Sequence, residues 1–180
     1  MERAAEAVQR RHSQLAVLLP DWVPSALKYP DRPWLTLLIA PLLTLPGALA
    51  LSALASVALP NLKRPEFPPL PWLTQLFSLV IFSPIAETLM MAGLLGLFRR
   101  WLGVVPAILL SAALWGMAHS LAAAAWGLIV WWPFVIFSLV YLVWQQKGFW
   151  SGIAMASAAH FLHNLMPAIL LIVGQANQAN

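Results

Sequence analysis

Long runs of apolar residues without a charged side chain constrain this sequence more than any other feature. Of its 180 residues, 61% are apolar and 9% are charged, whereas soluble domains carry about 25% charged residues. Several of the runs reach the roughly 18 residues that a helix needs to cross a bilayer. We therefore expect a multipass membrane protein whose surroundings are the lipid bilayer.

Five apolar runs are predicted to span the membrane, and none shows the alternation of a barrel strand. The runs cover residues 34–59, 73–97, 104–121, 126–144 and 152–173. We predict an all-α, polytopic membrane helical bundle of about five transmembrane helices, with a single domain at 34–174. Residues 1–33 are predicted to be a cytoplasmic or interfacial segment with a short interfacial helix from Glu2 to Leu19, and 175–180 a polar C-terminal tail.

The Lys and Arg residues are unequally divided between the two predicted sides of the membrane. Five in the N-terminal segment, with Arg99, Arg100 and Lys147, place eight on one side, whereas Lys63 and Arg64 place two on the other. Because cytoplasmic loops carry an excess of Lys and Arg, we expect a cytoplasmic N-terminus, an external C-terminus and a cell (inner or cytoplasmic) membrane. The net charge of +4 is then a topology signal, and no nucleic acid partner is expected.

A few polar side chains lie inside the predicted spans: Glu87 in the second, His119 in the third, and His160, His163 and Asn164 in the fifth. Ionisable groups at membrane depth are costly, so such residues are candidates for a functional site. The structural alternative is a protonated glutamate, or histidines, that tie helices together by hydrogen bonds.

The estimated depths of these side chains favour a shared site. At 1.5 Å per residue, Glu87 lies about 15 Å, His119 about 22 Å and His160 about 12 Å from the predicted cytoplasmic ends of their spans. The span ends are uncertain by a few residues, so the three can meet in one layer. A carboxylate and two imidazoles in a dry cavity can activate water and stabilise an oxyanion, as acyl hydrolysis requires.

Other hydrolase classes lack their residues in this sequence. The aspartates, Asp21 and Asp31, precede the first span, and the chain contains no Gly-x-Ser, no His-Glu-x-x-His and no cysteine. An intramembrane aspartyl protease, a serine elbow, a zincin helix and a thiol nucleophile are therefore excluded. Glutamate and histidine remain.

Three motifs in order resemble the CPBP or CAAX-protease-like (Abi) intramembrane endopeptidases, which are related to the type II CAAX prenyl endopeptidase. Glu87 corresponds to the first residue of Glu-Glu-x-x-x-Arg, Trp115 to His119 is similar to Phe-x-x-x-His, and His160 to Asn164 matches His-x-x-x-Asn. The resemblance covers about residues 73–170.

The sequence departs from the first motif at two positions, since Thr88 and Ala92 replace the second Glu and the Arg. Both partners of an i, i+4 pair are thus absent together, which can be nearly neutral for the fold. We expect the Thr88 hydroxyl to bond the Pro84 carbonyl four residues back. Catalytic strength is the property that these replacements put in question.

The resemblance implies an intramembrane, glutamic-type protease that acts on a membrane-associated peptide or protein. Its implied catalytic residues are Glu87, which activates water with help from His119, and His160 and Asn164, which donate to the oxyanion. No cofactor is expected, although zinc held by Glu87, His119 and His160 is possible. We interpret His163, about 60 degrees off the His160 face, as a supporting or structural group. The alternatives are a catalytically inactive immunity or scaffold protein and a small proton-coupled transporter.

Overall fold

The regular elements of this chain are all helical. The computed structural model describes residues 16–19, 21, 23–68 and 70–178, and every regular element among them is a helix. In order they are η1 (Ser25–Leu27), α2 (Pro33–Ala58), α3 (Trp72–Leu76), η2 (Phe77–Phe82), α4 (Ser83–Leu102), α5 (Val104–Ser120), α6 (Ala124–Trp144), η3 (Gln145–Lys147) and α7 (Phe149–Gln178). The all-α prediction is confirmed. Most of the predicted interfacial helix, Glu2 to Leu19, lies outside the described residues.

Four of the described helical segments are long and apolar enough to cross a membrane. They are Pro33–Ala58, Trp72–Leu102, Ala124–Lys147 and Phe149–Gln178. The third predicted span is the shorter apolar helix Val104–Ser120, with 17 residues. The second span is longer than predicted because α3, η2 and α4 follow one another without a break, and α7 continues through Gln178 into the predicted polar tail. The protein is therefore a multipass membrane protein with four long helices and one short one.

Proline and glycine set several of the helix ends. Pro33 opens α2 and Pro71 precedes α3, positions where a missing N–H leaves no helical bond unmade. Gly103 separates α4 from α5 with a φ of 82°, and Gly148 precedes α7 with a φ of 131°. Both angles lie in the region that L side chains rarely adopt, so these two turns need glycine.

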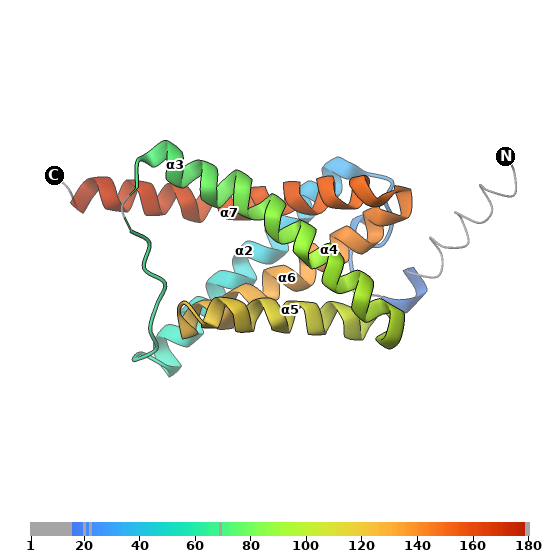
Figure 1. Ribbon diagram of the computed structural model, residues 1–180, viewed down its shortest axis with the longest axis horizontal. Helices are drawn as coiled ribbons and strands as arrows, with labels where there is room; N and C mark the ends of the chain where they lie inside the picture. Colours follow the sequence, from blue (N-terminus) through green and yellow to red (C-terminus); the bar gives the residue numbers. More distant parts are fainter. Residues whose placement is uncertain (1–15, 20, 22, 69, 179–180) are drawn as a thin grey trace, which may run out of the picture.

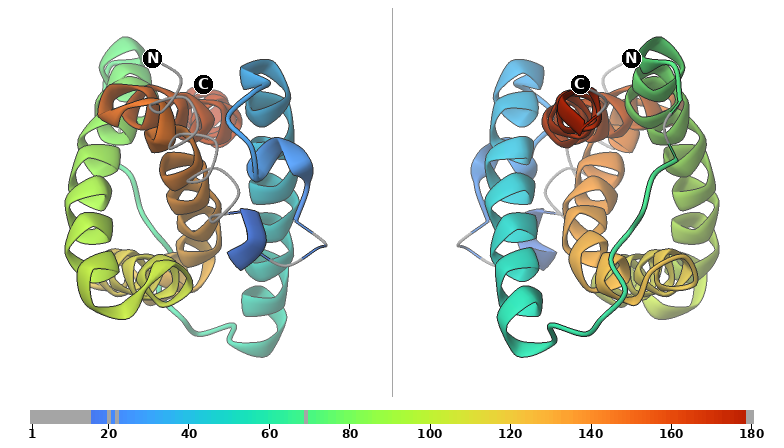
Figure 2. Two further views of the ribbon diagram at one scale, coloured as in Figure 1. Left: turned by 90° about the vertical axis from the view of Figure 1, so that its right-hand side faces the viewer. Right: turned by 90° about the vertical axis from the view of Figure 1, so that its left-hand side faces the viewer.

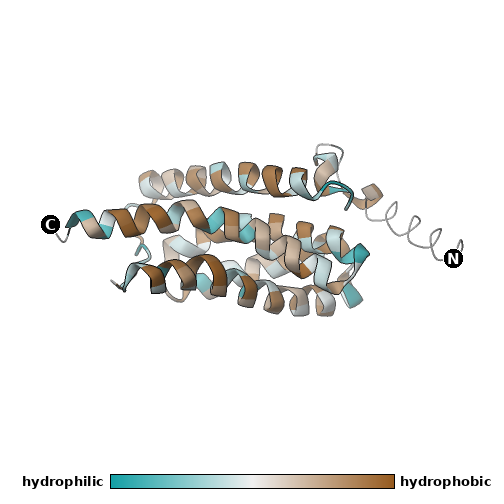
Figure 3. Ribbon diagram, turned by 90° about the horizontal axis from the view of Figure 1, so that it is seen from above, coloured by the Kyte–Doolittle hydropathy of each residue, from teal (hydrophilic) through white to brown (hydrophobic). Residues whose placement is uncertain are grey.

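Helix α6 forms the centre of the bundle. It contacts α2, α4, α5 and α7, which surround it in the end-on views of Figure 2. Of its most apolar window, 61% is buried inside the protein, against 17% for α2. Hydrophobic residues recur along the length of the helices (Figure 3), and many large apolar side chains on them are exposed. An apolar exterior around a packed central helix is the expected arrangement in lipid.

A close helix crossing joins α5 to α6 at Gly116 and Gly127. A Cβ added at Gly127 would lie 2.2 Å from the Gly116 backbone oxygen and 1.8 Å from the Ser120 hydroxyl oxygen. Small residues allow this approach, as is common where membrane helices cross. The crossing brings the last turn of α5, with His119, against the first turn of α6.

The chain runs back and forth along the bundle, so that η1 lies at one end and the last turn of α7 at the other (Figure 1). The α4–α5 turn and η3 lie at the same end as η1, and Arg99 Nη1 donates to Gln145 Oε1 over 3.0 Å there. The segment between α2 and α3 lies at the opposite end. Among the described basic residues, Lys28, Arg32, Arg99, Arg100 and Lys147 belong to or adjoin the elements at the first end, and Lys63 and Arg64 belong to the segment at the other.

Candidate active site

Glu87 and His160 meet in the interior of the bundle. Glu87 Oε2, from α4, lies 3.8 Å from His160 Nε2, from α7, and the two side chains are 16% and 5% exposed. The other carboxylate oxygen, Oε1, accepts a hydrogen bond from the Ser83 hydroxyl one turn earlier on α4. One oxygen is therefore held within its own helix and the other is directed at the imidazole.

A π-helical turn precedes this part of α4 and explains the position of Asn164. The Ser83 N–H bonds the Ser78 carbonyl, five residues back. With the same five-residue spacing, the Leu79 carbonyl would accept a hydrogen bond from the N–H of residue 84. Residue 84 is proline and has no N–H. Asn164 Nδ2 donates to the Leu79 carbonyl at 2.8 Å instead. The proposed oxyanion donor thus already uses one amide hydrogen to join α7 to the turn that carries Ser83 and Glu87.

Aromatic rings from α6 hold the His160 imidazole. The Phe137 ring stacks on it at 4.4 Å with an interplanar angle of 23°, and the Phe134 ring meets it edge-on at 5.5 Å. His160 Nδ1 is buried without a hydrogen-bond partner among the described residues. Packing rather than hydrogen bonding therefore orients this ring, and Nε2 faces Glu87.

His119 lies on the last turn of α5, beside the same aromatic group. Its Nδ1 lies 2.8 Å from the Trp115 carbonyl oxygen, which can only accept, so a neutral His119 carries its proton on Nδ1 and a lone pair on Nε2. The ring contacts Trp126 edge-on at 4.6 Å. The Phe134 ring contacts both His119, at 5.9 Å, and His160, at 5.5 Å between ring centroids. The side chains predicted from depth alone are thus neighbours.

The two departures from the first motif lie on the buried face of α4. Thr88 is 1% exposed and Ala92 is 5% exposed. The prediction that the Thr88 hydroxyl bonds the Pro84 carbonyl is wrong, because this buried oxygen has no partner among the described residues. Helix spacing made that bond available, but the side chain's rotation within its packed surroundings does not use it.

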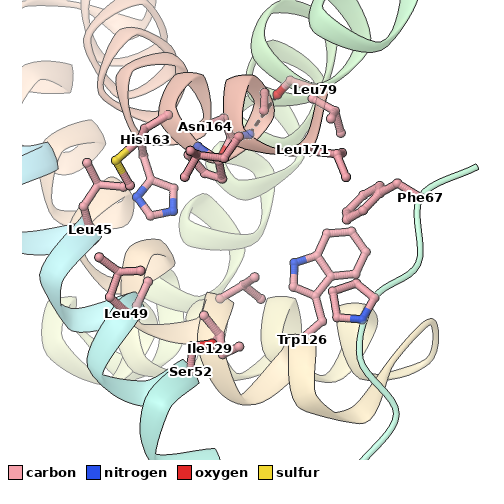
Figure 4. Close-up of a pocket in the computed structure, with 17 residues that line it drawn as sticks. Leu45, Leu49, Ser52, Phe67, Leu79, Trp126, Ile129, His163, Asn164 and Leu171 are labelled. Carbon is pink, nitrogen blue, oxygen red and sulfur yellow. Dashed lines mark hydrogen bonds between the residues drawn. The ribbon is translucent and has the colours of Figure 1, made fainter. Parts of the chain in front are cut away.

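A cavity of about 330 Å³ lies beside this site, between α2, α6 and α7. His163 and Asn164 lie on one side of it and Trp126 and Phe67 on the other (Figure 4). Glu87 and His160 do not line it. Asn164, one turn after His160, and Trp126, in contact with His119, connect the cavity to the site.

Sequence reasoning missed several contributors to this site. Ser83 could have been found, because a hydroxyl four residues before Glu87 shares its helix face. Thr44, whose hydroxyl oxygen lies 3.0 Å from His163 Nδ1, and the rings of Phe134 and Phe137 come from distant helices. No spacing in the sequence indicates these contacts.

The described residues do not form a ready metal site. No group of three His, Cys, Asp or Glu side chains in the part of the chain that the structure describes is arranged to hold a metal ion. The Glu87, His119 and His160 set does not fit zinc in this arrangement, so no step of the chemistry below passes through a metal.

Comparison with known proteins identifies the family. Residues 69–166 match the family model described as type II CAAX prenyl endopeptidase Rce1-like. No curated protein and no solved structure matches the chain. The matched region contains all three motifs and covers more than half of the chain. The chain therefore belongs to the type II CAAX prenyl endopeptidase Rce1-like family, a family of CAAX-type intramembrane proteases.

Proposed function

We propose that this protein is an intramembrane endopeptidase in which Glu87 activates the water that attacks a peptide bond. The observation that carries the proposal is the Glu87 carboxylate beside the His160 imidazole, 3.8 Å apart, within membrane-spanning helices. A buried carboxylate with an adjacent imidazole in a water-poor site is suited to general base catalysis. The substrate is a membrane-associated peptide or protein.

The distance between Glu87 and His160 suits a shared water molecule. At 3.8 Å the two atoms are too far apart for a direct hydrogen bond, but a water about 2.8 Å from each completes a triangle. Glu87 accepts one proton of this water as its oxygen attacks the carbonyl carbon. His119 Nε2 keeps a lone pair because Nδ1 is bonded to Trp115, so His119 can accept a hydrogen bond from a second water next to the attacking one and thereby assist Glu87.

Two groups on α7 are available to stabilise the tetrahedral oxyanion. As the water attacks, the His160 Nε2–H that held it transfers its hydrogen bond to the oxyanion, and the amide hydrogen of Asn164 that is not bonded to Leu79 is a second donor one helical turn away. Donors aimed at developing negative charge are worth about 10²- to 10³-fold each in rate. Glu87 then returns its proton to the leaving amine nitrogen, the C–N bond breaks, and the products are a carboxylic acid and an amine.

The proposal also covers the orientation in the membrane and the place where the substrate binds. We propose a cytoplasmic membrane with the N-terminus inside, because the predicted topology puts eight basic residues on that side and two on the other. The cavity beside the site is lined mainly by apolar side chains, which suits an apolar segment of the substrate.

The test is comparative proteomics of membranes that contain wild-type protein or Glu87→Gln. Glu66→Gln, which changes an exposed glutamate between α2 and α3, is the matched control. We expect at least one membrane protein to accumulate uncut in Glu87→Gln and to be cut in the other two. Identical peptide profiles in all three would contradict the protease and favour the scaffold or immunity protein. Proton uptake by liposomes that is lost in Glu87→Gln would favour the transporter.

A further inference from the structure

His163 is a half-buried histidine that the proposed chemistry does not use. Its Nδ1 lies 3.0 Å from the Thr44 hydroxyl oxygen on α2, and Phe137 contacts its ring edge-on at 5.8 Å. Thr44 is fully buried. His163 is therefore held between two helices with a fixed ring direction, which a merely space-filling residue would not need.

The hydrogen bond with Thr44 determines which ring nitrogen carries the proton. A helical serine or threonine can donate to its own helix, four residues back, as Ser56 does to the Ser52 carbonyl at 2.7 Å. The hydrogen bond described for the Thr44 side chain instead joins it to His163. If His163 Nδ1 donated, the Thr44 hydroxyl proton would be buried without a described acceptor, which is unfavourable. Thr44 therefore donates to Nδ1, and the proton of neutral His163 is on Nε2.

The second ring nitrogen faces the cavity of about 330 Å³ (Figure 4). Most of the cavity wall is aliphatic or aromatic, and its described polar side chains are Ser52, Trp126, His163 and Asn164. Asn164 already donates to Leu79. His163 thus presents an N–H to an apolar space, where an occupant that offers an acceptor is favoured over one that does not.

We propose that His163 Nε2–H binds a backbone carbonyl of the substrate and thereby selects an extended apolar peptide segment over a helical one. Most carbonyls of a helix accept bonds from its own N–H groups, whereas those of an extended segment are free. This inference rests on the proposed function for the identity of the occupant, but the direction of the His163 proton does not depend on it. Thr44 is a positioning residue and His163 a specificity-determining one.

The first measurement tests the proton position without any cleavage. The full chain, labelled with ¹⁵N in its imidazoles and reconstituted in lipid, is compared by NMR as wild type, Thr44→Ser and Thr44→Val, with His163→Gln used to assign the signal. We expect the Nε2–H tautomer in the wild type and in Thr44→Ser, and a mixture in Thr44→Val. An Nδ1–H tautomer in the wild type would overturn the proposal.

The second measurement tests binding in a Glu87→Gln background, where no bond is cut. The probes are two fluorescent decapeptides of leucine and valine, one extended and one held helical by α-methylated residues. His163→Leu should weaken binding of the extended probe about tenfold, as for one hydrogen bond, His163→Gln should retain it, and the helical probe should be unaffected. The double variant Thr44→Val/His163→Leu removes both polar groups together and serves if His163→Leu alone folds poorly. Equal affinities of both probes in every folded variant would overturn the proposal, whether or not the proteomic test finds a substrate.

Discussion

The π-turn before α4 predicts that Asn164 and Pro84 are energetically coupled. Asn164 donates to the Leu79 carbonyl, which is free because Pro84 has no N–H to offer. Asn164→Leu keeps the approximate size of the side chain but removes the donor. Pro84→Ala supplies the missing N–H. The loss of stability caused by Asn164→Leu should therefore be much smaller when Pro84→Ala is present.

The size of the coupling follows from the hydrogen bond. Leaving a buried carbonyl without a partner destabilises a protein by about 1–3 kcal/mol, so Asn164→Leu alone should lower the free energy of unfolding by that amount. In the Pro84→Ala background the new N–H can satisfy the Leu79 or Val80 carbonyl, and the same Asn164→Leu change should then lower it by less than about 0.5 kcal/mol. The expected coupling energy is at least about 1 kcal/mol.

The assay is equilibrium unfolding of the wild type, the two single variants and the double variant in mixed micelles with increasing SDS, together with the cleavage rate of any substrate found. If Asn164 also stabilises the oxyanion, adding Pro84→Ala to Asn164→Leu restores the stability of the protein but not its activity. The cleavage rate of the double variant then stays about 10²- to 10³-fold below that of the wild type. A coupling energy within about 0.5 kcal/mol of zero would refute the assignment of Asn164 to the π-turn carbonyl.

The remaining predictions concern packing, the metal, topology and the two motif departures. Gly127→Ala should lower the free energy of unfolding by about 1–3 kcal/mol, because a backbone oxygen of α5 would lie 2.2 Å from the added carbon. Gly96→Ala is the control, since its added carbon meets nothing within 4 Å. Equal stabilities of the two variants would contradict the close crossing. Purified, metal-stripped protein should retain cleavage, and recovery only on adding zinc would contradict the glutamate mechanism. A reporter fused after Asn180 should be active outside the cytoplasm, and cytoplasmic activity would contradict the proposed orientation. Thr88→Glu and Ala92→Arg should each reduce cleavage or stability, whereas the double change, in which the new charges can pair four residues apart, should recover much of the loss; a double-mutant cycle without coupling would contradict the paired replacement.

The sequence alone determined the class of the protein and the identity of its helices, and it supplied the candidate residues of the site. A bilayer leaves few options for an apolar run, since its backbone polar groups must bond within the segment. The spans and the all-α bundle could therefore be predicted from hydropathy. The meeting of Glu87 and His160 could be predicted from depth, because antiparallel helices at 1.5 Å per residue place such side chains in one layer.

The tertiary structure decided what lies around each polar group. Nothing in the order of the spans indicated that α6, which carries none of the predicted catalytic residues, would be the central helix and hold His160 with Phe137. Asn164 and Thr44 bond groups more than 80 residues away along the chain, and Thr88 lacks the local bond expected of it. Spacing within one helix fixes which residues share a face, but the hydrogen bonds that a buried side chain makes depend on which neighbouring helix leaves a group unsatisfied.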